Sequence, residues 1–196
     1  MSVVVAMKDG DRILVGCDSQ ITSGYTKSTL RSQVKIWKPE DDKNIIMGHV
    51  GILRDANIVS TTEKWVDELT AVNNSVDFKY VVRNIVPKMF SELRDCGRLK
   101  YINSMQSMES EFIFTYKNNA YMIECNGCVR EVEDFIAIGS GERLSLGAWN
   151  TIKKQDVSAE EKLIYTIKAA CENDIYVDYP IVIMNTKDDE VKIINS

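Results

Sequence analysis

The sequence predicts an α+β fold with four layers, an αββα sandwich of two antiparallel sheets between helix pairs. Short β-branched and aromatic runs are separated by tight-turn residues, a pattern typical of antiparallel hairpins. Helical patterns occur in two consecutive pairs, whereas a doubly wound parallel sheet would alternate single helices with single strands. No linker, repeat or low-complexity segment interrupts the 196 residues, so residues 1–196 are predicted to form a single domain.

Short strands dominate the first fifty residues. The Asp9-Gly10 turn predicts an opening hairpin, and a polar stretch follows at residues 19–32. A turn rich in acidic residues, at 39–42, separates the next two strands. The predicted strands are residues 3–7, 13–17, 34–37 and 44–47.

Two helices are predicted next, at residues 52–69 and 78–93. Apolar side chains recur on one face of each segment at helical spacing. Pro87 lies inside the second segment and should kink it, because proline lacks a backbone donor. Gly97 is a suitable C-terminal stop. These segments form the first helix pair of the predicted sandwich.

The second half of the chain repeats the order of strands, two helices and strands. One helix should follow the turn at residues 139–141 and end near residue 154. The next should begin at Ser158, because Ser158 and Glu161 have capping-box spacing. The predicted strands are residues 112–116, 121–125, 129–132, 135–138, 181–184 and 191–194.

The charge balance argues against a nucleic-acid surface. The chain has 24 Lys and Arg against 29 Asp and Glu, a formal charge of −5, with both signs interleaved. Phosphate binding requires clustered basic residues. No run approaches the roughly 18 apolar residues of a membrane helix, and the first residues lack a signal-peptide pattern. A cytoplasmic protein without nucleic-acid or membrane partners is therefore predicted.

The five cysteines are predicted to be free thiols, as expected in a reducing cytoplasm. Cys125 and Cys128 flank Asn126-Gly127, which favours a two-residue hairpin turn with the thiols on facing strands. A structural zinc site needs four ligands, and the chain has no second CxxC pair and a single histidine, His49. No metal site is predicted.

Four segments, taken in order, carry a resemblance that spans almost the whole chain. They are SVVVAMKDGDRILVGCDSQ at residues 2–20, VKI at 34–36, MGHVG at 47–51 and CNGCVREVEDFIAIGSG at 125–141. Together they resemble the proteasome β subunits and HslV, the peptidase of a bacterial two-component protease. Both are N-terminal-nucleophile (Ntn) hydrolases, so the resemblance implies the Ntn hydrolase fold.

The resemblance also implies a catalytic set. Ser2 matches the nucleophile, which removal of Met1 would place at the N-terminus. Its own α-amino group would then act as the base, since an α-amine has a pKa of ~7.7–8.0, near the working pH. Lys35 would favour the alkoxide, Asp18 would hold Lys35 charged and aimed, and the Gly48 amide would donate to the oxyanion.

Further positions are implied around this set. Ser140 and Asp174 would complete a hydrogen-bonded shell around the amine, although Val177 stands where β subunits carry a serine. HslV-like chains can bind a monovalent cation through carbonyls of this loop. That cation would lie near Asn173, Tyr176 and Tyr179, and no other cofactor is expected.

The same comparison suggests a specificity pocket. Ile46 and Val50 match positions that line it, so an apolar residue is expected before the scissile bond. His49 is interpreted as a pocket or interface residue, because the family needs no histidine. Ordinary roles stay open as well: Lys35 as a surface charge, Gly48 in a tight turn, and a helix-capping serine in the turn at 139–141.

The implied function is a peptidase that acts on peptides or unfolded protein inside a homo-oligomeric ring, with an ATP-dependent unfoldase as partner. The family generally uses threonine, whereas this chain has serine. Two alternatives remain open. One is a non-peptidase Ntn amidohydrolase or transpeptidase. The other is a catalytically silent ring subunit, which a retained Met1 would favour.

Overall fold

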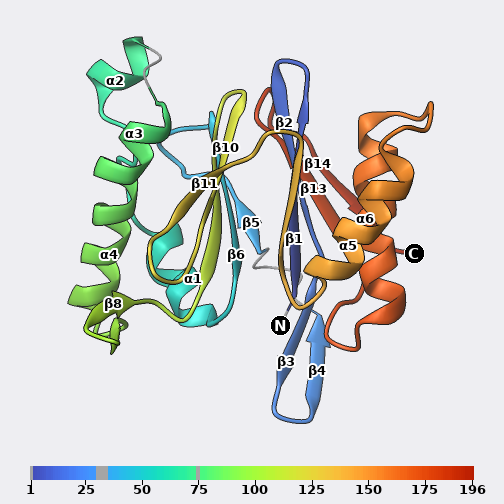
Figure 1. Cartoon of the computed structure of the whole chain (residues 1–196), viewed down its shortest axis with the longest axis horizontal. Coiled ribbons are helices and arrows are strands. Elements are labelled where there is room, and N and C mark those ends of the chain that lie inside the picture. Colours follow the sequence, from blue (N-terminus) through green and yellow to red (C-terminus); the bar gives the residue numbers. More distant parts are fainter. Residues whose placement is uncertain (1, 30–34, 74–75) are drawn as a thin grey trace.

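Two five-stranded sheets are stacked at the centre of the molecule (Figure 1). The computed structural model describes residues 2–29, 35–73 and 76–196. Every pairing in both sheets is antiparallel. The first sheet has the order β12 (Phe135–Gly139), β1 (Val3–Asp9), β2 (Arg12–Cys17), β13 (Ile181–Asn185) and β14 (Val191–Ile194). The second has the order β11 (Val129–Glu131), β10 (Asn119–Ile123), β9 (Glu111–Tyr116), β6 (Ile45–Val50) and β5 (Ile36–Trp37).

Helices cover the outer side of each sheet (Figure 1). The first sheet carries α5 (Glu142–Ile152) and α6 (Ala159–Asn173). The second carries α1 (Leu53–Ser60) and a helical run made of α3 (Phe78–Tyr80), the π-helical turn η1 (Val81–Ile85) and α4 (Val86–Asp95). The predicted αββα sandwich is therefore confirmed. No helix in the described ranges is long and apolar enough to span a membrane.

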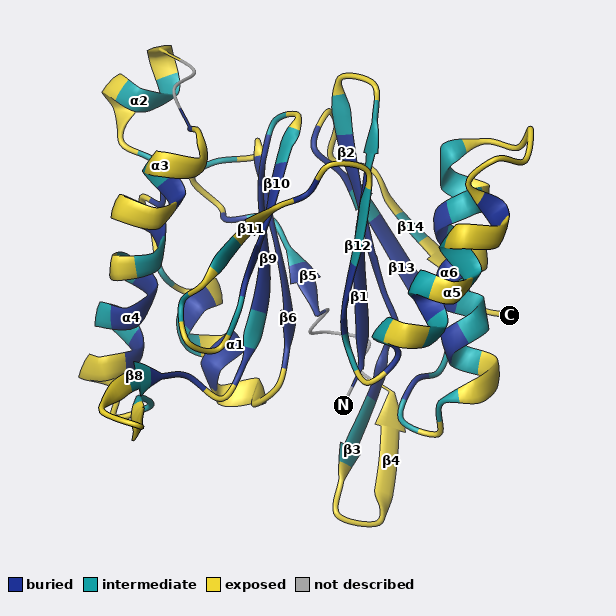
Figure 2. Ribbon diagram, in the orientation of Figure 1, coloured by how far each residue is buried: buried dark blue, intermediate teal, exposed yellow. Residues whose placement is uncertain are grey.

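Strand β1 shows why the central strands are apolar at nearly every position. Val4 and Ala6 point into the core between the sheets, and Val3 and Val5 pack under α6. Because both faces are covered, the strand has no polar side. Figure 2 shows this pattern, with buried strands inside and exposed positions on the outer faces of the helices. Because β1 is packed on both faces, the position of Ser2, directly before it, is fixed as well.

The predicted helix at residues 52–69 is wrong, because the structure divides it. α1 ends at Ser60, and α2 (Glu68–Asn73) is a separate short helix. Between them Lys64 has a φ of 55°, a left-handed conformation that a helix does not accept. The break lets Trp65 turn inward, where it is 2% exposed in the core beneath the helices. Burial of this indole overrides the helical periodicity.

The second predicted helix is confirmed, with a local change before its proline. The Val86 amide donates to the Val81 carbonyl across one π-helical turn, and Pro87 follows in the first turn of α4. Gly97, with a φ of 68°, lies just after the helix, as predicted. The capping box is also present, since Ser158 accepts from the Glu161 amide.

Two hairpins were not predicted from the sequence. They are β3 (Gln20–Ser23) with β4 (Thr26–Thr29), and β7 (Lys100–Ile102) with β8 (Met105–Ser107). The first lies in the polar stretch and projects from the sandwich near the N-terminus (Figure 1). Every residue of β4 is exposed, so no apolar alternation marks it. Of the strand predicted at 34–37, β5 retains Ile36–Trp37, and residue 34 lies outside the described ranges.

The five cysteines are free thiols, as predicted. The hairpin predicted at the CxxC pair is present between β10 and β11, but its two-residue turn is wrong. Cys125 and Cys128 lie in the connection between β10 and β11 and not on the strands. The Glu124 amide donates to the Cys128 carbonyl, which makes the loop longer than two residues. Cys96, Cys125 and Cys128 are exposed, whereas Cys17 is buried.

Candidate active site

Ser2 lies directly before β1 and is 7% exposed. The β1–β12 pairing aligns Val3 with Gly139, which brings the loop after β12 alongside Ser2. The Ser2 nitrogen donates to Ser140 Oγ at 3.1 Å, and the Ser2 carbonyl accepts from the Gly141 amide at 3.2 Å. Gly139 has a φ of 96°, and a Cβ there would collide with the Ser2 carbonyl oxygen. The glycines of this loop therefore allow its close approach to Ser2.

Ser140 contacts Ser2 and does not cap α5. Its hydroxyl contacts both the nitrogen and the carbonyl of Ser2. The N-cap of α5 is Gly141, which has no side-chain cap. Removal of Met1 would turn the Ser2 nitrogen into the α-amine while leaving it beside the same hydroxyl.

Asp18, directly after β2, organises the floor of the site. Its Oδ1 accepts from Lys35 Nζ at 2.7 Å and from the Val3 amide at 2.9 Å. Its Oδ2 accepts from the amides of Gln20 at 3.0 Å and Asp178 at 3.4 Å. Burial raises the pKa of Asp18, and Lys35 and the backbone donors oppose that shift. One carboxylate thus joins the start of β1, the start of β3 and the loop after α6.

Lys35 is held on two sides, and the predicted Asp18–Lys35 pair is present. Lys35 Nζ donates to Asp18 Oδ1 at 2.7 Å and to the Gln20 carbonyl at 2.6 Å. Its side chain is 8% exposed. Two acceptors at these distances fix the ammonium within the site, so Lys35 is not a solvated surface charge.

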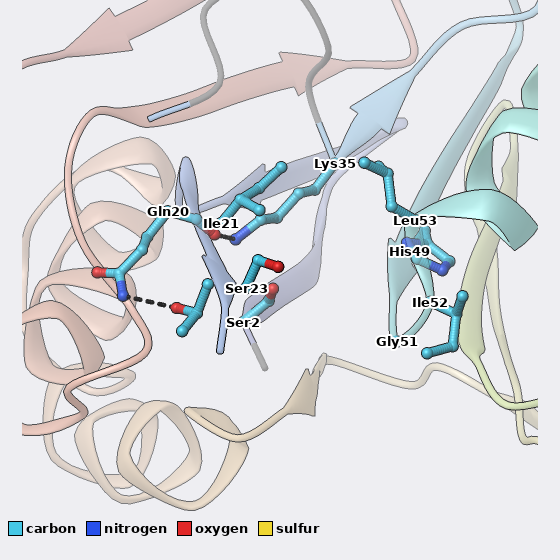
Figure 3. A pocket seen from close by; sticks show the side chains of 10 residues that line it. Ser2, Gln20, Ile21, Ser23, Lys35, His49, Gly51, Ile52 and Leu53 are labelled. Carbon is cyan, nitrogen blue, oxygen red and sulfur yellow. Dashed lines mark hydrogen bonds between the residues drawn. The ribbon is translucent and has the colours of Figure 1, made fainter. Parts of the chain in front are cut away.

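A cavity of about 310 Å³ opens beside Ser2 (Figure 3). One wall holds Ser2, Lys35 and residues 20–23 of β3. The facing wall holds His49 and residues 51–53, between β6 and the start of α1. The candidate nucleophile Ser2, the Lys35 cation and the single histidine of the chain therefore line the same cavity. This cavity is the candidate active site.

His49 ends a chain of buried polar contacts. Its Nε2 lies 3.1 Å from Ser110 Oγ, Ser110 donates to Asp55 Oδ2 at 2.8 Å, and Arg98 Nε donates to Asp55 Oδ1 at 2.6 Å. Burial first, and the nearby Lys35 charge second, lower the pKa of His49 to about 3, and the Ile52 backbone opposes the shift. His49 is therefore neutral at physiological pH and unsuited to general base catalysis.

Sequence reasoning did not identify Ser110, Asp55 or Arg98 as site residues. Ser110 directly precedes β9, Asp55 lies in α1, and Arg98 lies in the segment after α4. No motif joins positions so far apart in the chain, so the sequence alone carries no signal for this group.

The structure does not bring Gly48 to the cavity. Gly48 lies inside β6, paired with Ile36 and Ile113, and not in a turn. The His49 amide donates to the Lys35 carbonyl on the β5 side. Successive N–H groups of a strand point to opposite edges, so the Gly48 amide faces β9. A Cβ at Gly48 would lie 2.7 Å from Val4 Cγ1, so packing between the sheets explains this glycine.

The two predicted specificity residues on β6 do not line this cavity. Ile46 and Val50 point into the core between the sheets. Val50 instead contributes to a neighbouring cavity of about 490 Å³. The apolar specificity expected from these side chains thus has no basis in the described wall of the active-site cavity.

Asp174 caps the end of α6 and does not bond to Ser2 or Ser140 within the described part of the chain. Its Oδ1 accepts from the Tyr176 amide at 2.9 Å, and its Oδ2 is buried without a partner there. Val177 is buried in the apolar cluster under α6. The cation near Asn173, Tyr176 and Tyr179 stays a prediction. The described residues contain no group of His, Cys, Asp or Glu side chains arranged to hold a metal ion.

An αββα sandwich whose first strand begins directly after a candidate nucleophile, with a buried lysine–aspartate pair beside it, defines an N-terminal-nucleophile hydrolase. A family model described as proteasome subunit matches residues 2–183. The chain therefore belongs to the proteasome subunit family.

Relatives and solved structures agree with this assignment. The ATP-dependent protease subunit HslV of Borreliella burgdorferi is 27% identical over 186 residues, covering 93% of this chain and 94% of the relative. Thiobacillus denitrificans BPH in complex with epoxomicin has a TM-score of 0.71 at 17% identity, covering 99% of this chain and 100% of the other. HslV from Trypanosoma brucei has a TM-score of 0.67 at 18% identity, with coverages of 93% and 98%. At these identities the structures support the fold alone.

Proposed function

We propose that this chain is a peptidase that cleaves peptide bonds with Ser2 as its N-terminal nucleophile, once Met1 has been removed. The observation that carries the proposal is the shared cavity of Ser2 and Lys35, with Lys35 Nζ held 2.7 Å from Asp18. A serine hydroxyl is a weak nucleophile without a base. The α-amine created at Ser2 would be that base, on the residue itself.

The proposed reaction proceeds through an ester. Ser2 Oγ attacks the substrate carbonyl, and its proton passes to the α-amine. Collapse of the tetrahedral intermediate breaks the C–N bond, and the leaving amine takes that proton. Water then hydrolyses the acyl-enzyme by the same proton transfers in reverse. Lys35 supplies positive charge throughout, which favours the alkoxide.

We assign the oxyanion donor to Gly51. It lies directly after β6, in the cavity wall that also carries His49. Its φ of 125° and the 2.6 Å approach of a Cβ to the Glu109 carbonyl oxygen explain why glycine is needed there. Loss of one such donor typically costs ~10²–10³ in rate.

The proposal extends to assembly. The related HslV is a subunit of an ATP-dependent protease, which supports a homo-oligomeric ring, an ATP-dependent unfoldase as partner and unfolded protein as substrate. The free thiols support a cytoplasmic location. Serine in place of the family's threonine keeps the hydroxyl and lacks only a methyl group, so the chemistry is retained.

Intact mass after incubation with epoxomicin tests the proposal. An epoxyketone has two electrophilic carbons, so the hydroxyl and amine of one N-terminal residue can both react with it. We expect loss of Met1 and one adduct that maps to Ser2. Ser2→Ala should give no adduct, whereas the control Ser23→Ala, in the same cavity wall, should react normally. Retained Met1 without an adduct would contradict the proposal and favour the silent-subunit alternative.

Turnover separates the remaining alternative. Ser2→Ala should abolish cleavage of unfolded casein and of short peptides, with the oligomeric state unchanged by light scattering. An adduct at Ser2 without cleavage of any peptide would favour an amidohydrolase or transpeptidase.

A further inference from the structure

The proton positions around Ser110 determine the state of His49. Ser110 Oγ contacts Asp55 Oδ2, the Ile52 amide and His49 Nε2. Asp55 is 0% exposed and bonded to the Arg98 guanidinium, so its carboxylate accepts the single hydroxyl proton. The Ile52 amide can only donate. Ser110 therefore accepts from His49, and the histidine proton lies on Nε2.

A neutral histidine protonated at Nε2 has a lone pair on Nδ1. Of the described residues, Ser110 hydrogen-bonds the ring, at Nε2, and the Ile52 backbone is the other hydrogen-bonding group close enough to affect its pKa. His49 is 4% exposed, and it lines the cavity opposite Ser2 (Figure 3). Its ring also packs on Phe112, with 5.1 Å between the ring centroids. The ring is thus held by Ser110 on one side and by an aromatic side chain on another, which leaves one acceptor for the cavity.

The surroundings of this acceptor limit what it can bind. Lys35 lies in the same cavity, which disfavours a cationic side chain beside it. A carboxylate has no proton to donate at neutral pH and would oppose the Nδ1 lone pair. A purely apolar side chain would leave the acceptor unsatisfied, and unpaired buried polar groups are penalised. An uncharged donor, such as an amide or a hydroxyl, meets all three conditions.

We propose that His49 is a specificity-determining residue that accepts a hydrogen bond, through Nδ1, from an uncharged donor on the substrate side chain next to the scissile bond. Ser110, Asp55 and Arg98 are positioning residues that fix its orientation and proton. The inference rests on the proposed peptidase function. It replaces the apolar preference predicted from Ile46 and Val50, whose side chains point into the core.

Isosteric pairs of peptide epoxyketones test the inference on the mature protein. The residue beside the electrophile is Asn or Leu in one pair and Gln or Glu in the other, and adduct formation at Ser2 is timed by mass spectrometry. We expect the Asn compound to react about 10-fold faster than the Leu compound, because leaving one polar group unpaired slows the reaction by roughly that factor. The Gln compound should exceed the Glu compound by at least the same ratio.

Variants identify the source of the preference. His49→Phe keeps an aromatic ring and removes both nitrogens, so the Asn/Leu ratio should fall to about 1, mainly through slower reaction of Asn. His49→Gln, which retains an acceptor, should restore part of the ratio. Ser23→Ala removes a different hydroxyl from the cavity wall and should leave the ratio unchanged.

The wild-type ratio decides the matter even if a variant fails to fold. Equal or faster reaction of Leu in the wild type would overturn the inference and leave the proposed function standing. A preference for Asn that persists in folded His49→Phe would also overturn it. Absence of reaction at Ser2 with every electrophile would overturn both proposals together.

Discussion

The buried Asp18–Lys35 pair should respond very unequally to loss of its two members. Asp18 accepts four hydrogen bonds, from Lys35 and from three backbone amides. Asp18→Asn removes the negative charge and places an NH₂ group among those donors. The Lys35 ammonium, 8% exposed, then has only the Gln20 carbonyl. Leaving a buried charge without its partner typically costs about 3–5 kcal/mol, so we expect about 4 kcal/mol for Asp18→Asn.

Lys35→Met should cost much less, about 1–2 kcal/mol. Asp18 keeps its three backbone donors, which continue to stabilise the carboxylate when the cation is gone. Methionine also replaces the apolar stem of the lysine. The difference between the two variants therefore reflects which group has alternative partners.

Urea unfolding followed by tryptophan fluorescence, at pH 7.5 and one protomer concentration, measures both values. With a typical slope of about 2 kcal/mol per molar urea, Asp18→Asn should lower the midpoint by about 2 M. Asp9→Asn in the partly exposed Arg12–Asp9 pair is the control and should cost under about 1 kcal/mol. Equal losses for Asp18→Asn and Lys35→Met, or a loss below about 1 kcal/mol for Asp18→Asn, would refute the reasoning.

Three further predictions concern other parts of the molecule. The pKa of His49 is lowered to about 3 in the folded chain, so between pH ~6.5 and that value only the unfolded chain binds this proton. As the pH falls through this range, the free energy of unfolding should decrease by about 1.4 kcal/mol per pH unit more in the wild type than in His49→Phe, measured by urea unfolding. Identical pH profiles would contradict the assigned burial. Ellman's reagent should titrate the three exposed cysteines quickly and all five only in urea, because burial raises the pKa of both Cys17 and the partly buried Cys171 to about 12. Five fast thiols in the native protein would be inconsistent with the fold. Ser158→Ala should lower the free energy of unfolding by about 1 kcal/mol. Ser158→Thr should lower it by only a few tenths, because threonine also accepts from the capped amide and donates to Glu161. Equal losses for the two variants would argue against the capping box.

The local elements of this fold could be predicted because local rules decide them. The opening hairpin follows from the Asp9-Gly10 turn, and the start of α6 follows from the spacing of Ser158 and Glu161. The helix predicted across residues 52–69 failed because the burial of Trp65 outweighs the local periodicity. The β3–β4 hairpin was missed because its exposed strand has no apolar side to alternate.

The order of residues along the chain determined which groups reach the centre of the site. Ser2 lies directly before a strand buried on both faces, and Asp18 directly follows the strand that pairs with it. The resemblance placed Lys35 with them, and the structure shows the ion pair. Short-range pairing and a motif were sufficient for this part.

Tertiary structure alone decided which glycine faces the cavity and what surrounds His49. Strand register turns the Gly48 amide toward β9, and a shift of one residue would reverse it. Ser110, Asp55 and Arg98 meet His49 because α1 and β9 pack against β6, bringing together positions up to 61 residues apart. Such contacts depend on how whole elements pack, and no local pattern in the sequence encodes them.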